Sequence, residues 1–254
     1  MIDSHCHLTF GPLLNQIAAV LERARAAGVT DCITVGTTIE DTHRALELAE
    51  RWPCVHVTAG IHPHEAAKVA PGWDRDLEAL ARRPDVAAVG ETGLDYHYDF
   101  ADRPTQRRVF ERELEIAAAV GKPVIIHCRE AQADALDVLA DFPDPGRVVF
   151  HCFTGTVEEA RVLLDRGHWL SLTGVVTFKK SGALREVARL LPDDRLMVET
   201  DSPYLSPAPV RHHRPNEPAH VVHTARCIAE QRGLAAEALE SLTVANTRRF
   251  FAIE

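Results

Sequence analysis

The 254-residue chain has no apolar run that approaches the roughly 18 residues of a membrane-spanning helix. It also lacks the basic stretch followed by a long apolar run that marks a signal peptide, so we expect a cytoplasmic protein without a membrane partner. The six cysteines form no C-x-x-C pair, and a disulfide framework is not expected in a chain of this size without an export signal. We expect all six to pack as small hydrophobic residues in the core.

Positive charge is scarce, because 28 Lys and Arg face 37 Asp and Glu, which gives a net charge of −9. This balance counts against tight binding of duplex nucleic acid, since phosphate affinity comes mostly from Lys and Arg. It does not exclude an enzyme that handles a phosphodiester locally through metal ions. Cations do gather after two predicted strands, where they create either a local positive potential or ordinary solvated loops; they are Lys179, Lys180, Arg211, His212, His213 and Arg214.

Short β-branched runs alternate with amphipathic segments along the whole chain. The predicted strands cover residues 2–4, 32–36, 55–61, 86–91, 124–127, 148–151, 168–173 and 196–201. Eight strands with intervening helices predict an α/β fold, a single (β/α)8 TIM barrel that spans residues 1–254 as one domain. A doubly wound sheet is the alternative, because periodicity cannot show whether a sheet closes.

Histidines and carboxylates gather at the C-terminal ends of these predicted strands. His5 and His7 are two positions apart, so a strand aims both side chains at one face. The whole set consists of His5, His7, Glu91, His127, His151 and Asp201. In a barrel this is the face that carries the active site.

Each of these residues has an ordinary explanation when taken singly. A histidine can be a hydrogen-bonded rim residue, Glu91 can cap a helix, and Asp201 can form a turn before Pro203. Together they are much harder to explain without a cation, because burying four imidazoles and two carboxylates is costly. The pattern therefore predicts a metal site.

Six ligands exceed what one ion with an open coordination position requires. Two divalent ions about 3.5–4 Å apart, bridged by a carboxylate, use them economically. We expect Glu91 to be the bridge, with His5, His7 and Asp201 on one ion. His127 and His151 then hold the other. Nitrogen and oxygen ligands without thiolate suit Zn²⁺, Mn²⁺, Fe²⁺ or Mg²⁺.

The segments "MIDSHCH", "GIHPH", "GETGLDYHYD", "KPVIIHCREAQAD", "HCFTG" and "LPDDRLMVETDSPYL" together resemble the TatD family of metal-dependent deoxyribonucleases. "RPNEPAHV" and "ANTRRFF" extend the resemblance across essentially the entire chain, whereas H-x-H alone is shared by the wider amidohydrolase superfamily. The resemblance implies a TIM barrel with a dinuclear site and hydrolysis of DNA phosphodiesters, often exonucleolytic from the 3′ end. The family's ligands fall on the same six residues. The chain departs from the family at Thr9, where Asp or Asn is usual, so the tuning of the ligands can differ here.

Three residues are candidates for catalysis, namely Asp201, Glu91 and His62. Asp201 either orients the attacking water and takes its proton, or serves as a ligand alone. His62 contacts a phosphate or protonates a leaving oxygen, and its alternative is a rim histidine packed beside Pro63.

Candidate substrate-binding residues are His62, His64 and Arg129. Arg129 is a phosphate fork or, alternatively, a salt-bridge partner of Glu130 or Glu91. Tyr96 and Tyr98 offer a stacking surface for an unpaired base, or else pack the loop.

Two rival functions remain open from the sequence. One is an amidohydrolase-type enzyme that cleaves a small amide, lactone or phosphoester; such barrels often bridge their metals with a modified lysine where this chain has Glu91. The other is a metal-dependent scaffold, which has no reason to leave metal coordination open. We expect a deoxyribonuclease that acts on single-stranded DNA ends, with two Mg²⁺, Mn²⁺ or Zn²⁺ ions and no stable protein partner.

Overall fold

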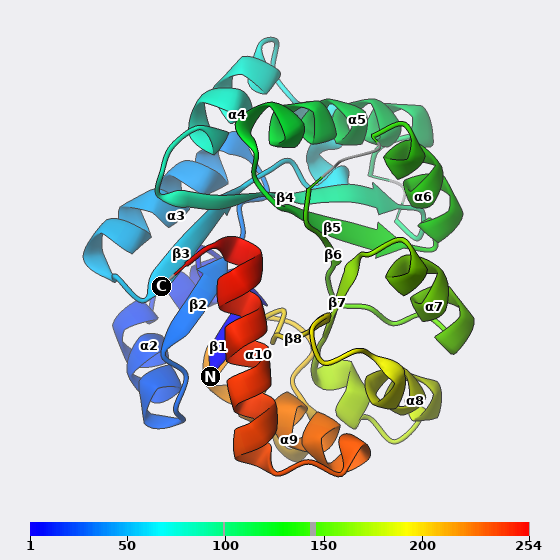
Figure 1. Ribbon diagram of the computed structural model, residues 1–254. Coiled ribbons are helices and arrows are strands. Elements are labelled where there is room, and N and C mark those ends of the chain that lie inside the picture. Colours follow the sequence, from blue (N-terminus) through cyan, green and yellow to red (C-terminus); the bar gives the residue numbers. More distant parts are fainter. Residues whose placement is uncertain (99, 143–145, 254) are drawn as a thin grey trace. The chain divides into compact units, whose positions relative to one another are not determined.

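Eight strands form one sheet in the order β1 to β8 (Figure 1). The computed structural model describes residues 1–98, 100–142 and 146–253. The strands are β1 (Ile2–Cys6), β2 (Asp31–Thr34), β3 (Val55–Ala59), β4 (Val86–Asp95), β5 (Val124–Arg129), β6 (Val148–Phe150), β7 (Trp169–Leu172) and β8 (Leu196–Val198). Strand order follows chain order and a helix separates successive strands, which is the topology of a (β/α)8 barrel. The predicted fold class is confirmed.

Helices fill the connections between the strands. The α-helices are α1 (Gly11–Leu14), α2 (Ile17–Ala26), α3 (Ile39–Arg51), α4 (Trp73–Ala81), α5 (Arg103–Val120), α6 (Gln132–Ala140), α7 (Val157–Asp165), α8 (Gly182–Leu190), α9 (Val221–Arg232) and α10 (Ala236–Phe251). Four 3-10 helices are η1 (Pro63–Lys68), η2 (Gly174–Thr177), η3 (Ala208–Val210) and η4 (Pro218–His220). In the described part of the chain no helix is both long and apolar enough to cross a membrane.

Local sequence signals explain where the helices begin and end. The Asp102 carboxylate accepts a hydrogen bond of 2.7 Å from the backbone N–H of Thr105 and so caps α5. This helix ends at Gly121, whose φ of +69° is the left-handed conformation that glycine adopts without strain. At α7, Thr156 and Glu159 form a reciprocal capping box.

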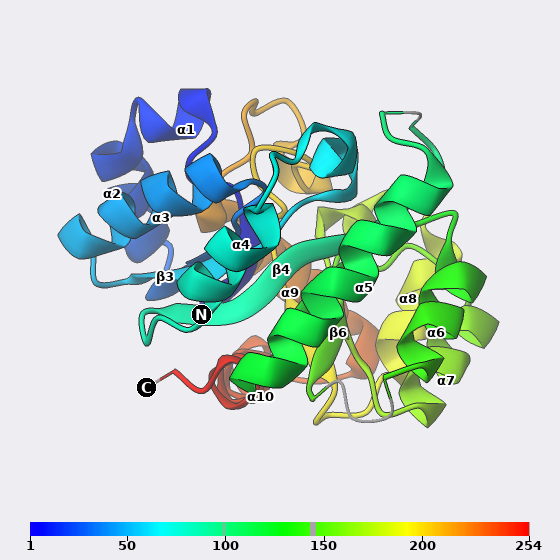
Figure 2. The same cartoon turned by 90° about the horizontal axis from the view of Figure 1, so that it is seen from above.

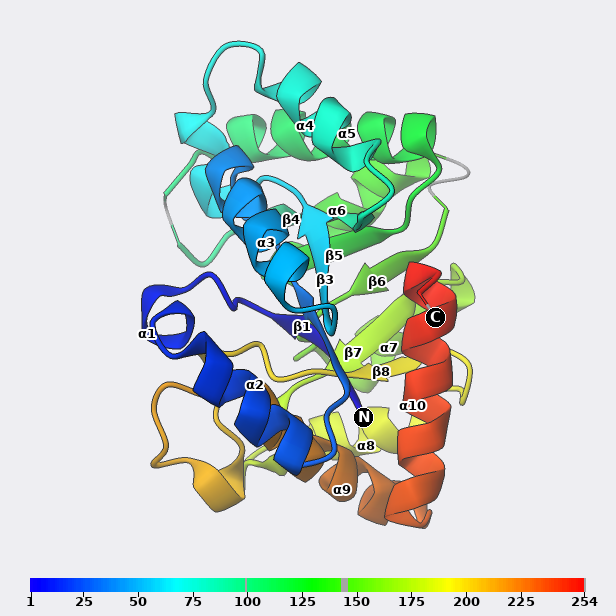
Figure 3. The ribbon, with the colours of Figure 1, turned by 90° about the vertical axis from the view of Figure 1, so that its left-hand side faces the viewer.

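The described chain divides into two compact units. The first unit comprises Met1–Thr34 and Cys152–Glu254, and the second comprises Val35–His151. In the first unit β1 pairs with β2 and β7 pairs with β8, both in parallel. The C-terminal helix α10 packs against β8 and β1, and α9 packs against α8 and α10 (Figure 3).

The second unit contains the consecutive parallel pairs β3–β4, β4–β5 and β5–β6. Its longest helix, α5, packs along β4 and against α4 (Figure 2). The assignment of residues 1–254 to a single domain stays a prediction.

Three strands end at different places from those expected in a way that affects the candidate ligands. Strand β4 runs to Asp95, and β5 runs to Arg129, because the ladder between them continues through the pair Asp95–Arg129. Strand β8 ends at Val198, three residues earlier than expected, and Asp201 therefore follows the strand on a loop. Glu91 and His127 thus lie inside their strands, not at the ends.

The cysteine prediction is correct only in part. All six cysteines are free thiols, as expected. Cys6 and Cys32 are buried, but the other four are partly exposed, namely Cys54, Cys128, Cys152 and Cys227. Cys54 precedes β3 and Cys227 lies on α9, so neither belongs to a buried strand interior.

Candidate metal centre

One candidate ligand group lies in the first unit and consists of His5, His7 and Asp201, here called the Asp201 cluster. His5 is the fourth residue of β1, and His7 follows that strand directly. The Nε2 atoms of His5 and His7 lie 3.9 and 3.3 Å from Asp201 Oδ1. One donor atom from each of the three side chains lies within 4.8 Å of the others. The spacing of two positions therefore does place both imidazoles beside one carboxylate.

Backbone hydrogen bonds bring Asp201 to the end of β1. Its N–H donates to the carbonyl oxygen of His5 (3.0 Å), and the N–H of His7 donates to that of Ser202 (2.7 Å). Asp201 itself has a φ of +53°, a left-handed conformation that Asp tolerates better than most side chains. The loop after β8 is thereby fixed against β1, which explains how a residue beyond the strand reaches the two histidines.

Asp3 of β1 helps to hold the Asp201 cluster in place through Thr200. Its carboxyl group accepts hydrogen bonds from the backbone N–H of Thr200 (2.8 Å) and from the Thr200 hydroxyl (2.5 Å). Burial raises the pKa of Asp3 to about 8, although the bonds from Thr200 act in the opposite direction. Asp3 therefore holds the residue that immediately precedes Asp201.

The second candidate group lies in the other unit and centres on the buried carboxylate of Glu91; we call it the Glu91 cluster. Glu91 Oε1 lies 2.8 Å from His151 Nε2, 2.9 Å from His127 Nδ1 and 3.4 Å from His62 Nε2. Side-chain exposure is 2% for Glu91 and 13% for His62. Three imidazoles thus converge on one carboxylate oxygen: His127 lies within β5, His151 directly follows β6, and the predicted catalytic residue His62 lies on the loop after β3.

An irregularity in β4 gives Glu91 its position. The register of β4 against β5 shifts between Val89 and Thr92, and a shift of this kind re-aims the side chains next to it. Gly93 has a φ of +130°, and a Cβ atom there would overlap the carbonyl group of His127. Glycine at this position therefore lets β4 approach the strand that carries a candidate ligand.

Asp95 also belongs to this site, although it is not among the predicted residues. Its Oδ2 lies 2.9 Å from both His127 Nε2 and His64 Nε2, and its Oδ1 accepts from the backbone N–H groups of His97 and Tyr98. Burial alone would raise the pKa of Asp95, but the hydrogen bonds from His127 and His64 hold it well below its usual range. The sequence carries one signal for Asp95. Residues 91 and 95 are four positions apart, so a strand that continues beyond Glu91 aims both side chains at the same face.

Two histidines of the cluster have pKa values shifted in opposite directions. Burial lowers the pKa of His62 to about 4, so this imidazole is neutral near pH 7. Burial also acts to lower the pKa of His127, but its hydrogen bonds with Asp95 and Glu91 outweigh that effect and raise it. Because Asp95 faces Nε2 of His127, the Nδ1 atom is directed at Glu91.

The predicted substrate-binding residues lie beside the Glu91 cluster in the same unit. The His64 ring packs against those of Tyr98 (5.5 Å between centroids) and Phe100 (4.7 Å). The Arg129 guanidinium lies 4.9 Å above the Tyr98 ring, and among the described residues it forms no ion pair. The alternative in which Arg129 pairs with Glu130 or Glu91 is thus wrong, and Glu130 instead pairs with His97 at 2.7 Å.

Tyr96 and Tyr98 differ in what their rings can offer. The Tyr96 ring is covered by the guanidinium of Arg103 at 4.0 Å, and its hydroxyl donates to Asp134 (2.6 Å). Tyr96 therefore packs the loop. The Tyr98 side chain is 43% exposed and remains the better stacking surface.

The family model described as TatD related DNase matches residues 2–252. This chain belongs to the TatD family. A relative from Citrobacter koseri, "3'-5' ssDNA/RNA exonuclease TatD", is 39% identical over 259 aligned positions that cover 100% of this chain and 99% of the relative. A relative of the same name from Cronobacter turicensis is 40% identical and covers 99% of this chain and 97% of its own. Both relatives match along nearly their whole length, so TatD similarity is not confined to the ligand motifs.

Solved structures agree with this TatD assignment. The crystal structure of YJJV, a TatD homologue from Escherichia coli K12, superposes with a TM-score of 0.94 at 28% identity and covers 100% of this chain and 98% of that one. A phosphotriesterase homology protein from Escherichia coli shares the fold at a TM-score of 0.70 and 15% identity, covering 98% of each chain.

Proposed function

We propose that this TatD protein is a metal-dependent exonuclease that removes nucleotides from the 3′ end of single-stranded DNA or RNA. The observation that carries the proposal is the convergence of three imidazoles on the buried carboxylate oxygen of Glu91. The names of the relatives from Citrobacter koseri and Cronobacter turicensis support the substrate class and the direction of cleavage.

The side chains fit divalent cations in both clusters. Imidazole nitrogens and carboxylate oxygens without thiolate are the donors that Zn²⁺, Mn²⁺ and Mg²⁺ accept to different degrees. We propose that one cation binds His5, His7 and Asp201, whose donor atoms are grouped within 4.8 Å. A second cation is proposed to bind Glu91, His127 and His151, with His62 beside them. The bridging of two ions by Glu91 stays a prediction.

The chemistry divides between the cations and the protein. Bound divalent cations stabilise negative charge on a phosphodiester and generate a nucleophile from water near neutral pH. The Asp201 carboxylate is proposed to orient the attacking water and to accept its proton. Asp95 holds the ring of His127 by its Nε2, as hydrogen bonds beyond the ligands commonly do in metal enzymes. His62, His64 and Arg129 are proposed to contact the substrate.

The first test uses protein stripped with a chelator and then given Mg²⁺, Mn²⁺ or Zn²⁺ in turn. Single-stranded DNA or RNA labelled at its 5′ end is incubated with each form, and the products are separated by length. We expect a metal-restored ladder that shortens from the 3′ end and that is absent with Glu91→Ala. Bound metal is measured on the same samples.

Intact DNA and RNA under every metal, with the ions demonstrably bound, would contradict the proposal. Hydrolysis of a small phosphoester or lactone in those same samples would then identify a small-molecule hydrolase. Loss of bound metal in Glu91→Ala, with its thermal unfolding still cooperative, separates a lost ligand from a lost fold.

A further inference from the structure

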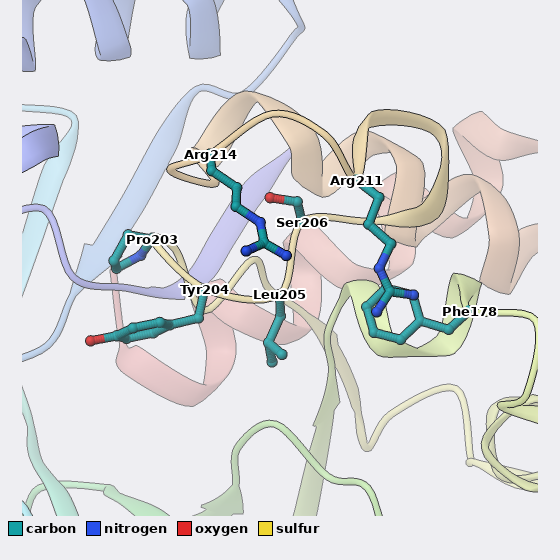
Figure 4. A pocket seen from close by; sticks show the side chains of 7 residues that line it. All are labelled: Phe178, Pro203, Tyr204, Leu205, Ser206, Arg211 and Arg214. Carbon is teal, nitrogen blue, oxygen red and sulfur yellow. The ribbon is translucent and has the colours of Figure 1, made fainter.

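A pocket of about 360 Å³ lies in the first unit (Figure 4). Its wall comes from the loop after β8 and from Phe178, which follows η2. The volume is at the lower end of the roughly 300–1,000 Å³ that small-ligand sites occupy. Two guanidinium groups, those of Arg211 and Arg214, line it together with the ring of Tyr204.

The arginines of this pocket are not neutralised by carboxylates. Neither Arg211 nor Arg214 forms an ion pair within the described residues, and no Asp or Glu occurs between residues 203 and 215. The acidic residue that follows in sequence, Glu217, is engaged by Arg23 with N–O distances of 2.8 and 2.5 Å. The pocket is therefore cationic in a chain whose net charge is −9.

One of the two guanidinium groups stacks on an aromatic ring. The Cζ atom of Arg211 lies 3.8 Å above the centre of the Phe178 ring (Figure 4). An arginine that stacks on an aromatic face keeps the N–H groups at its edge available for a phosphate. The stacking thus favours one orientation of the Arg211 donors at the exposed edge of the pocket.

Tyr204 connects the pocket with the Asp201 cluster. Its ring centroid lies 6.1 Å from that of His7 and 6.1 Å from that of Phe10, and its N–H donates to the carbonyl oxygen of Asp201 (2.9 Å). The Tyr204 and Phe10 side chains are 53% and 41% exposed. The flat part of a ligand could therefore stack on Tyr204, next to the candidate metal ligand His7. A negative charge on the same ligand would then face Arg211 and Arg214.

Side chains also hold this loop in shape. Asn216 donates to the carbonyl oxygens of Thr200 (3.1 Å) and Tyr204 (2.6 Å), so it ties the two ends of the loop together. Inside the loop, the hydroxyl of Ser206 donates to the carbonyl oxygen of His213 (2.6 Å). The pocket is consequently a preformed feature.

We infer that this pocket binds the nucleotide on the 5′ side of the scissile phosphate, with a base against Tyr204 and the next backbone phosphate at Arg211 and Arg214. The inference rests on the proposed exonuclease function. When an enzyme releases the 3′-terminal nucleotide, the scissile phosphate is the last phosphate of the strand. All other phosphates lie on the 5′ side of the bond that is cleaved. A cationic pocket beyond the cluster can therefore meet a second phosphate only in the strand that is retained.

The test compares a thymidine dinucleotide with the trinucleotide, both with hydroxyl groups at each end. The dinucleotide has only the scissile phosphate, whereas the trinucleotide has one more on the 5′ side. We expect kcat/KM of the metal-loaded wild type to be about tenfold higher for the trinucleotide. A factor of this size corresponds to one charge-assisted hydrogen bond at an exposed site. In Arg211→Ala/Arg214→Ala this ratio should fall to about one.

A neutral methylphosphonate at the upstream phosphate should reduce the wild-type ratio in the same way and have no further effect on the double variant. Arg161→Ala removes one positive charge from the exposed face of α7, outside the pocket, and should leave the ratio unchanged. A wild-type ratio near one, or a ratio that the double variant retains, would overturn the inference while exonuclease activity persists. Failure to cleave either substrate would instead contradict the exonuclease function.

Discussion

The two candidate metal clusters use the same donor groups but are built in different ways. In the Glu91 cluster, three imidazoles lie 2.8–3.4 Å from one oxygen of a carboxylate that sits inside a strand. In the Asp201 cluster, two imidazoles lie 3.3 and 3.9 Å from a carboxylate that sits on a loop. The first arrangement is fixed by strand pairing and by Asp95, and the second by backbone hydrogen bonds to the end of β1. We therefore expect the Glu91 cluster to bind its cation more tightly.

The largest expected effect is on activity. Glu91→Gln keeps the size of the side chain but removes the charge that three imidazoles share. We expect kcat/KM on single-stranded DNA to fall by about 1,000-fold or more, the loss of several kcal/mol of transition-state stabilisation. Asp201→Asn removes a ligand of the other cluster together with the proposed proton acceptor, and we expect it to cost less, about 100-fold.

Metal analysis of the same variants sharpens the comparison. Two ions per chain are expected in the wild type, and fewer in each variant after gel filtration. Glu47→Gln, which changes an exposed residue of α3, is the matched control for charge. A larger loss of bound metal in Asp201→Asn than in Glu91→Gln would reverse the assignment of the tighter cluster.

An intermediate effect is expected from the support of the Glu91 cluster. Asp95→Asn leaves a hydrogen-bond acceptor for His127 but removes the negative charge. Affinity for Zn²⁺ or Mn²⁺ should fall about 10–100-fold, as is usual when such a supporting partner is lost. Competition with a chromogenic chelator measures this affinity, and Asp137→Asn on the exposed face of α6 is the control. Unchanged affinity would show that Asp95 serves only the loop that follows it.

The smallest effects concern stability, and the two units are expected to respond to pH with opposite signs. In the second unit Glu113 is fully buried, and burial raises its pKa well above the ordinary 4.5. Its contribution to the free energy of unfolding therefore decreases as the pH rises from about 4.5 toward that raised pKa. In the first unit burial lowers the pKa of His168 from 6.5 to about 4. Its contribution decreases as the pH falls through this range, by at most about 3 kcal/mol.

Urea unfolding between pH 4.5 and 8, with chelator present throughout, tests both signs. Glu113→Gln can still accept from the N–H of Ile61 and hydrogen-bond with Thr92, so it should gain stability relative to the wild type as the pH rises. His168→Gln should gain relative stability as the pH falls. His43→Gln on the exposed face of α3 should run parallel to the wild type. Equal slopes in all four proteins would show that neither buried group titrates with unfolding.

The fold class and the types of candidate metal ligand could be predicted from the sequence, because both follow from local patterns. Period-two spacing placed His5 and His7 beside one carboxylate, and that relation is local. The extension of β4 to Asp95 depends on its pairing with β5, more than thirty residues away, and on a register shift that no local pattern shows. Asp95 was missed because the strand was expected to end at Glu91.

The cationic pocket illustrates the same limit. The positive residues of the loop after β8 were visible in the sequence, but not whether they face solvent or a site. The contact that orients Arg211 comes from Phe178, a residue on a different loop. Such pairs are set by tertiary structure and not by spacing along the chain.

The bonds of Asn216 have a consequence for how such proteins diversify. The Asn216 side chain fastens Tyr204 to the far end of the loop. Residues 205–215 therefore form a loop whose two ends are held together. Insertions and deletions are best tolerated in segments of this kind. We expect the length of this loop to vary among relatives. Such changes would alter which nucleic-acid strand is accepted while the neighbouring Asp201 is preserved.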